Sequence, residues 1–141
     1  MKRIRLLVLL SVLAVALPVG LLSGVAKATG GSGTSVSISQ TADFNAAGAQ
    51  LDVNLNVRCR GGTGLAEVTV NQDSPETGVP DTTGTGFNFA VVCDGQTHSV
   101  GVTVIGVVYD PGKAYAIADV TPPPGGSGPG HAEKWITIHV N

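Results

Sequence analysis

The chain has 141 residues, of which 43% are hydrophobic and only 13% are charged. Eight Lys and Arg residues against ten Asp and Glu residues give a formal charge of −2. This balance argues against nucleic acid and anionic membrane surfaces as partners, because both are bound mainly through Lys and Arg. Abundant Val, Thr and Gly are typical of strands joined by tight turns, and the length indicates one domain.

Residues 1–28 have the pattern of a secretory signal peptide. Lys2, Arg3 and Arg5 precede an apolar run over 6–22, and Ala26-Lys27-Ala28 is a signal-peptidase site. We predict cleavage before Thr29 and a secreted, extracellular protein. The alternative is an uncleaved membrane anchor, for which the apolar run is short. Without residues 1–28 the chain keeps four basic and ten acidic residues, a formal charge of −6.

Residues 29–34 are predicted to form a flexible leader, followed by one domain over 35–141. The first strand is expected over 35–41, with Val36 and Ile38 on one face. Residues 50–60 alternate strictly between apolar and polar, which predicts a strand with one buried and one solvated face. The inward residues are Leu51, Val53, Leu55, Val57 and Cys59. Gly61, Gly62 and Gly64 are expected to turn the chain into a third strand over 65–71, with Ala66, Val68 and Val70 inward.

A fourth strand is predicted over 85–93 and a fifth over 96–108. Asp94-Gly95 between them is a strong signal for a two-residue hairpin turn. That turn would pair Cys93 with Gln96 and Val91 with His98. The apolar face of this hairpin would comprise Phe87, Phe89, Val91, Val100, Val102 and Val104.

Two further strands are expected over 113–120 and 134–140, separated by a Pro/Gly/Ser loop at 122–130. Ile136, Ile138 and Val140 would face inward on the last strand. Seven short strands with regular turn signals predict an all-β, seven-stranded antiparallel sandwich.

Cys59 and Cys93 are the only cysteines, and in an exported chain an even number predicts a disulfide. A reactive thiol is the alternative, but no CxxC spacing supports it. The bridge also constrains the topology. Strands 50–60 and 85–93 lying two positions apart in one sheet would be separated by about 10 Å, too far for a disulfide. Either strand 85–93 joins strand 65–71 in the opposite sheet, or bending at the edge closes the gap.

Residues 110–117, Asp-Pro-Gly-Lys-Ala-Tyr-Ala-Ile, resemble the E–F corner of fibronectin type III and other immunoglobulin-like domains. The resemblance implies an immunoglobulin-like sandwich and a tyrosine corner at Tyr115, whose hydroxyl would bond to backbone a few residues upstream. Two features depart from the antibody pattern. No Trp occurs in the second or third strand, and the cysteines do not lie on the second and sixth strands.

Residue types that carry catalysis do not form a recognisable set. His98, His131 and His139 lack metal-ligand spacing, and neither a Gly-x-Ser-x-Gly elbow nor a phosphate-binding loop occurs. We therefore predict no enzyme, no metal and no cofactor. Asp73, Glu76 and Asp81 leave calcium as an alternative reading of one loop, although the usual calcium-loop pattern is absent.

Two groups of residues are candidates for a binding surface. Trp135 falls on the outer face of its strand, where it would stack on a ligand or else cover the proline loop. Asn54, Asn56 and Arg58 lie on the polar face of strand 50–60, which is a ligand surface or simply a solvated face.

The sequence thus favours a secreted, non-catalytic binding or surface-interaction module for a protein or carbohydrate ligand. One alternative is a small-molecule carrier similar in size and class to the secreted apoproteins of the enediyne antibiotics. The other is a protease inhibitor that uses the loop at 72–84. The oligomeric state is left open.

Overall fold

The computed structural model describes residues 33–73 and 81–141, and all regular structure in these ranges is β-strand. The predicted signal peptide, most of the leader at 29–34, and Glu76 lie outside the described residues. The strands are β1 (Ser35–Asn45), β2 (Gln50–Gln72), β3 (Thr82–Ile105), β4 (Gly112–Thr121) and β5 (Gly130–Val140). Within the described residues, no helix has the length and apolar character needed to cross a membrane.

The described part of the chain contains five strands, so the prediction of seven separate strands is wrong. The expected strands 50–60 and 65–71 are the two halves of β2, and 85–93 and 96–108 fall largely on β3. Gly61 and Gly62 have φ values of 120° and 117°, which favour glycine. They let β2 bend sharply without losing its partner, so no turn separates its halves.

Asp94-Gly95 does not form the expected hairpin. Asp94 pairs with Arg60 and Cys93 pairs with Gly62, so β3 continues alongside β2 through the bend. His98 is therefore opposite Val57 and not opposite Val91. The local preference of Asp-Gly for a tight turn is outweighed because β2 supplies backbone partners on both sides of Gly95.

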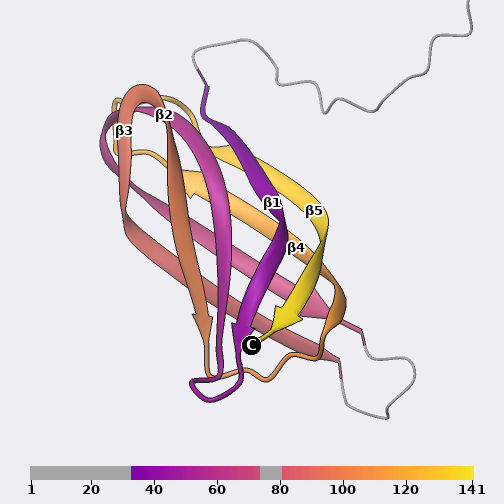
Figure 1. The fold of residues 1–141 in the computed structure, drawn as a ribbon. Helices are drawn as coiled ribbons and strands as arrows, with labels where there is room; N and C mark the ends of the chain where they lie inside the picture. The colour runs from indigo at the N-terminus through magenta and orange to yellow at the C-terminus, as the bar shows by residue number, and fades with distance from the viewer. Residues whose placement is uncertain (1–32, 74–80) are drawn as a thin grey trace, which may run out of the picture.

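Together β2 and β3 form a long antiparallel ribbon that folds over on itself, as the top of Figure 1 shows. The first half of β2 pairs with the second half of β3, from Gln50–Ile105 to Arg58–Thr97. The second half of β2 pairs with the first half of β3, from Ala66–Asn88 to Gln72–Thr82. The segment 85–93 therefore joins the segment 65–71, which resolves the choice that the sequence left open.

The other strands close the folded ribbon into a small barrel. β1 pairs antiparallel with the first half of β2 and parallel with β5, while β4 pairs with β5 and with the second half of β2. On the remaining side the two halves of β3 approach each other. Asn88 Nδ2 donates to the Gly101 carbonyl at 2.7 Å, and a Cβ on Gly86 would lie 2.4 Å from the Thr103 carbonyl oxygen.

The core is built mainly from small and branched aliphatic side chains. All the inward residues expected on β2 are buried, as are Val91, Val100, Val102 and Val104 of β3 and Ile136 and Ile138 of β5. Ile38 is buried, and Val36 packs against the core from its margin. Val140 differs from expectation, because 42% of its side chain is exposed at the end of β5.

Phe87 and Phe89 do not face the core, contrary to the prediction from the hairpin register. Gly64 pairs with Val91 and Ala66 pairs with Asn88, so β3 has two residues opposite Leu65 alone. This β-bulge reverses the alternation of β3. Gly84 and Gly86 then point inward, where no phenyl ring would fit, while Phe87 and Phe89 are 49% and 74% exposed.

Candidate binding surface

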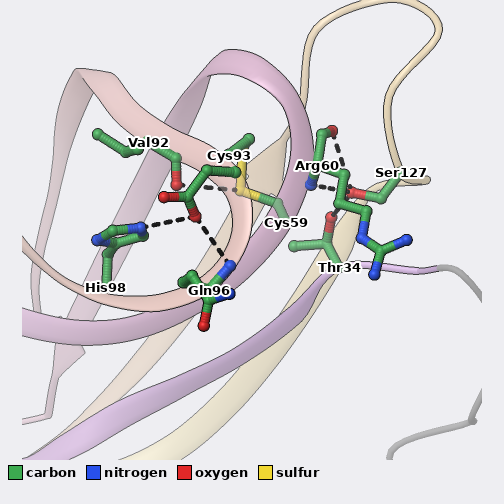
Figure 2. The surroundings of a disulfide bond; sticks show 9 residues. Thr34, Cys59, Arg60, Val92, Cys93, Gln96, His98 and Ser127 are labelled. Atoms are coloured by element: carbon green, nitrogen blue, oxygen red, sulfur yellow. Dashed lines mark hydrogen bonds and ion pairs between the residues drawn. A yellow bond between two sulfur atoms is a disulfide. The ribbon is translucent and has the colours of Figure 1, made fainter.

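The two cysteines form a disulfide at the bend of the ribbon. The Cα atoms of Cys59 and Cys93 are 4.4 Å apart, and the chain has no free cysteine. Figure 2 shows the bridge joining the two strands where both of them turn over. Arg58 Nε donates to the Gly95 carbonyl at 2.9 Å beside it. The bridge therefore links the two strands at the bend. Both cysteines are oxidised in this structure, so neither is available as a reactive thiol.

The loop between β4 and β5 is hydrogen-bonded to the same bend. The Ser127 hydroxyl accepts from the Arg60 backbone N–H at 3.0 Å, and the Ser127 N–H donates to the Arg60 carbonyl at 3.0 Å. The same hydroxyl shares a hydrogen bond of 2.8 Å with Thr34 (Figure 2). Backbone and hydroxyl contacts therefore hold the loop against this end of the barrel.

The two groups of residues predicted as candidates for a binding surface lie on separate parts of the barrel. Asn54, Asn56 and Arg58 are exposed on the first half of β2. Trp135 is on β5, and β1 lies between β5 and that half of β2. The polar face of β2 and the tryptophan are therefore two different surfaces.

Trp135 lies on an exposed sheet face and is itself 61% exposed. It is opposite Tyr115 of β4, and the two ring centroids are 5.0 Å apart with the planes tilted by 57°. Trp135 is exposed and Tyr115 is half-buried. Such a pair offers apolar area with polar tips, which suits a contact surface.

Tyr115 has a different partner from the one that a tyrosine corner implies. Its hydroxyl donates to the Glu133 carboxylate of β5 and not to an upstream backbone carbonyl. The buried tyrosine is Tyr109, whose hydroxyl donates to the Val70 carbonyl at 3.2 Å. Burial raises the pKa of Tyr109 to about 12.

A chain of hydrogen bonds extends from Tyr115 across the same face. Glu133 Oε1 lies 3.1 Å from Nε2 of His131, and Nδ1 of His131 lies 2.6 Å from Asp119 Oδ1. The hydrogen bond to Asp119, and then that to Glu133, raises the pKa of His131. The Tyr115 hydroxyl and His131 in turn lower the pKa of Glu133. All four groups remain accessible to water.

The register of four strand segments assembles these side chains into three rows. One row is Phe87, Glu67, Asp119 and His131; the next is Thr85, Thr69, Ile117 and Glu133; the third is Thr83, Asn71, Tyr115 and Trp135. Phe89 lies beside Phe87, with ring centroids 6.0 Å apart. We call this surface, formed by the three rows and Phe89, the aromatic–acidic face.

Sequence reasoning misses most of this face. It places His131 only at the surface and does not identify its partners Asp119 and Glu133. The alternation over 113–120 and 134–140 predicts which face of the sheet each residue lies on. It does not predict which residue of the neighbouring strand lies opposite, because that depends on the register. The same reasoning assigns Phe87 and Phe89 to the core, because the bulge leaves no clear mark in the sequence.

The other candidates from the sequence are His98, His139 and the acidic residues Asp73, Glu76 and Asp81. His98 lies 2.8 Å from Asp94 Oδ1 near the bend. Among the described residues, no group of three or more His, Cys, Asp or Glu side chains is arranged to hold a metal ion. Asp73 and Asp81 are exposed, and the calcium alternative stays untested because Glu76 lies outside the described residues.

No model of a known protein family matches this sequence, and no curated protein matches it at a significant level.

Proposed function

We propose that this protein is a secreted, non-catalytic binding module whose contact surface is the aromatic–acidic face. The carrying observation is that this face has two aromatic pairs, Phe87–Phe89 at one edge and Tyr115–Trp135 at the other, together with hydrogen-bonded carboxylates. Phe87, Phe89 and Trp135 are 49%, 74% and 61% exposed. Apolar side chains gathered on one exposed surface are typical of interaction sites, and Trp and Tyr are frequent among residues that dominate binding energy.

We also propose that the domain is immunoglobulin-like, and the order of strand pairing supports this. β1, the first half of β2 and the second half of β3 pair side by side. The first half of β3, the second half of β2, β4 and β5 follow one another as a second group. In this proposal the two groups are the two facing sheets of the sandwich.

The position of the Tyr115–Glu133–His131–Asp119 chain favours binding over catalysis. Glu133 and Asp119 have side chains 48% and 55% exposed, and His131 is 54% exposed. Acid–base catalysis and electrostatic stabilisation are most effective where water is excluded. An open sheet face provides recognition groups but no enclosed site for a reacting substrate.

The proposal is tested with peptide and glycan arrays probed by the protein expressed from its full-length sequence. The face variant is Phe89→Ser with Trp135→Ser. Its matched control is Ile105→Ser with Val108→Ser, which removes two large apolar side chains that are 65% and 70% exposed elsewhere. We expect ligands bound by the wild type and the control but lost in the face variant. Equal binding by both variants, or no ligand of either class, would contradict the proposed function.

A further inference from the structure

We propose that the aromatic–acidic face binds an extended, arginine- or lysine-rich segment of a partner protein. This inference rests on the proposed function and adds the chemical class of the partner. It is drawn from the distribution of charge over the face, from the aromatic pair beside the carboxylates, and from the hydrogen bonds that its polar groups already make.

The net charge of this face is negative. Its carboxylates are Glu67, Asp119 and Glu133, and its only basic group is the imidazole of His131. Two negative charges therefore remain even when His131 is protonated. No Lys or Arg occurs in the three rows, and Lys113 is in the row beyond Tyr115. A cationic partner is the complement of such a surface, and charge complementarity favours both its approach and its register.

The remaining basic side chains of the domain are engaged or lie elsewhere. Lys134 Nζ donates to the Ile38 carbonyl at 3.1 Å. Arg58 and Arg60 are at the bend of β2, where Arg58 donates to Gly95. Among the described residues, therefore, no lysine or arginine in the three rows neutralises the negative potential of the face.

The aromatic rings suit the same partner. Trp135 and Tyr115 are adjacent to Glu133, so a guanidinium group can contact a ring face and a carboxylate at once. Arginine makes such cation–π contacts more often than lysine, and Trp is the best ring for them. Phe87 and Phe89 at the other edge of the face can take the aliphatic parts of a bound segment.

The hydrogen-bonding state of the face favours a basic peptide over a carbohydrate. Thr83 donates to Asn71 at 2.8 Å, Thr69 and Thr85 share a hydrogen bond of 3.1 Å, and Tyr115 is bonded to Glu133. These groups are partly satisfied within the protein, which leaves fewer sites for sugar hydroxyls. The net charge, in contrast, is not satisfied within the face.

The test uses fluorescence of Trp135, the only tryptophan of the chain, together with calorimetry. The probes are an extended peptide of alternating Arg and Val, the same peptide with Glu in place of Arg, and a linear glucose hexasaccharide. The protein is expressed from its full-length sequence. The test variant is Asp119→Asn with Glu133→Gln. The control, Asp43→Asn with Asp52→Asn, removes the same charge from β1 and the first half of β2.

We expect the arginine peptide to bind and to shift the Trp135 emission to shorter wavelength. The dissociation constant should rise at least about tenfold in the test variant and less than about twofold in the control. Equal weakening in both variants would mean attraction by net charge alone and would overturn the inference. Absence of arginine-peptide binding would overturn it as well. If only the hexasaccharide binds, and Trp135→Ala abolishes that binding, the proposed function stands and the basic partner is excluded.

Discussion

Tyr109 is the one aromatic hydroxyl among the described residues that is buried in the core. Its ring meets Phe44 nearly edge-on at 5.8 Å, and its hydroxyl donates to the Val70 carbonyl. Because burial raises its pKa to about 12, this hydroxyl remains a donor throughout the neutral range. Gly84 lies against it, since a Cβ there would be 2.4 Å from the hydroxyl oxygen.

Tyr109→Phe should lower the free energy of unfolding by about 1 kcal/mol, the usual net value of one intramolecular hydrogen bond. The ring and its packing would be kept. Tyr115→Phe is the matched control, because its hydroxyl bond is exposed and its loss should change stability by less than about 0.5 kcal/mol. Urea unfolding of both variants measures the difference, and similar losses would contradict the assigned role of Tyr109.

His131 should titrate above the ordinary histidine pKa of 6.5, because Asp119 and Glu133 favour its charged form. A pKa raised by folding stabilises the protein below the unfolded value, and this contribution disappears as the pH rises through the folded value. The stabilisation from His131 is therefore present in mild acid and lost at alkaline pH. NMR titration of the His131 ring protons measures this pKa.

Asp119→Asn should move the pKa of His131 back toward its ordinary value, since Asp119 is the main cause of the shift. Asp43→Asn, which changes an exposed carboxylate on β1, is the control and should leave the titration unchanged. An unaltered His131 titration in Asp119→Asn would show that the hydrogen bond does not control its protonation.

At the scale of the strands, β3 depends on glycine where its first half passes the second half. Gly86→Ala should cost about 1–3 kcal/mol, because a Cβ would lie 2.4 Å from the Thr103 carbonyl oxygen and backbone must move. Gly128→Ala is the control, since no atom lies within 4 Å of the position that its Cβ would take. Thermal unfolding should separate the two variants, and equal melting temperatures would contradict the close approach of the two halves.

The strands could be predicted from sequence wherever one face of the strand is buried and the other is exposed to solvent. The alternation over Leu51–Cys59 identifies the buried side of β2 without error, because each side chain of a strand points opposite to its neighbour. The continuity of β2 and β3 could not be predicted in the same way. Glycines and Asp-Gly favour turns locally, and only the backbone partner alongside decides whether the strand ends or bends.

The aromatic–acidic face could be predicted only in part, for a related reason. Trp135 is a candidate from sequence because its neighbours Ile136 and Ile138 assign it to the outer side of its strand. To predict the hydrogen-bond chain from Tyr115 to Asp119, one would need the register of β4 against β5, in which Asp119 is opposite His131. That register is set by packing of the whole barrel and not by the residues of either strand.

For the whole molecule, the disulfide should be the largest single constraint on the unfolded chain. Closing a loop with a sequence separation of 34 residues contributes about 4 kcal/mol in the chain-entropy model. Cys59→Ala with Cys93→Ala should lower stability by about that amount, with a matching fall in melting temperature. Calorimetry of the variant and of the reduced wild type measures this, and a change below about 1 kcal/mol would contradict it.

The parallel pairing of β1 with β5 determines how the domain would respond to a pulling force. Thr41–Phe44 of β1 pair with Thr137–Val140 of β5, so pulling the two chain ends apart draws these strands past each other lengthwise. Their hydrogen bonds would then be loaded in shear and break together rather than one by one. The Cys59–Cys93 bridge would also prevent the segment between the cysteines from extending. The contour length of the unfolded chain would then be shorter by roughly 110–120 Å. In a force spectrometer, reduction of the bridge should restore that length.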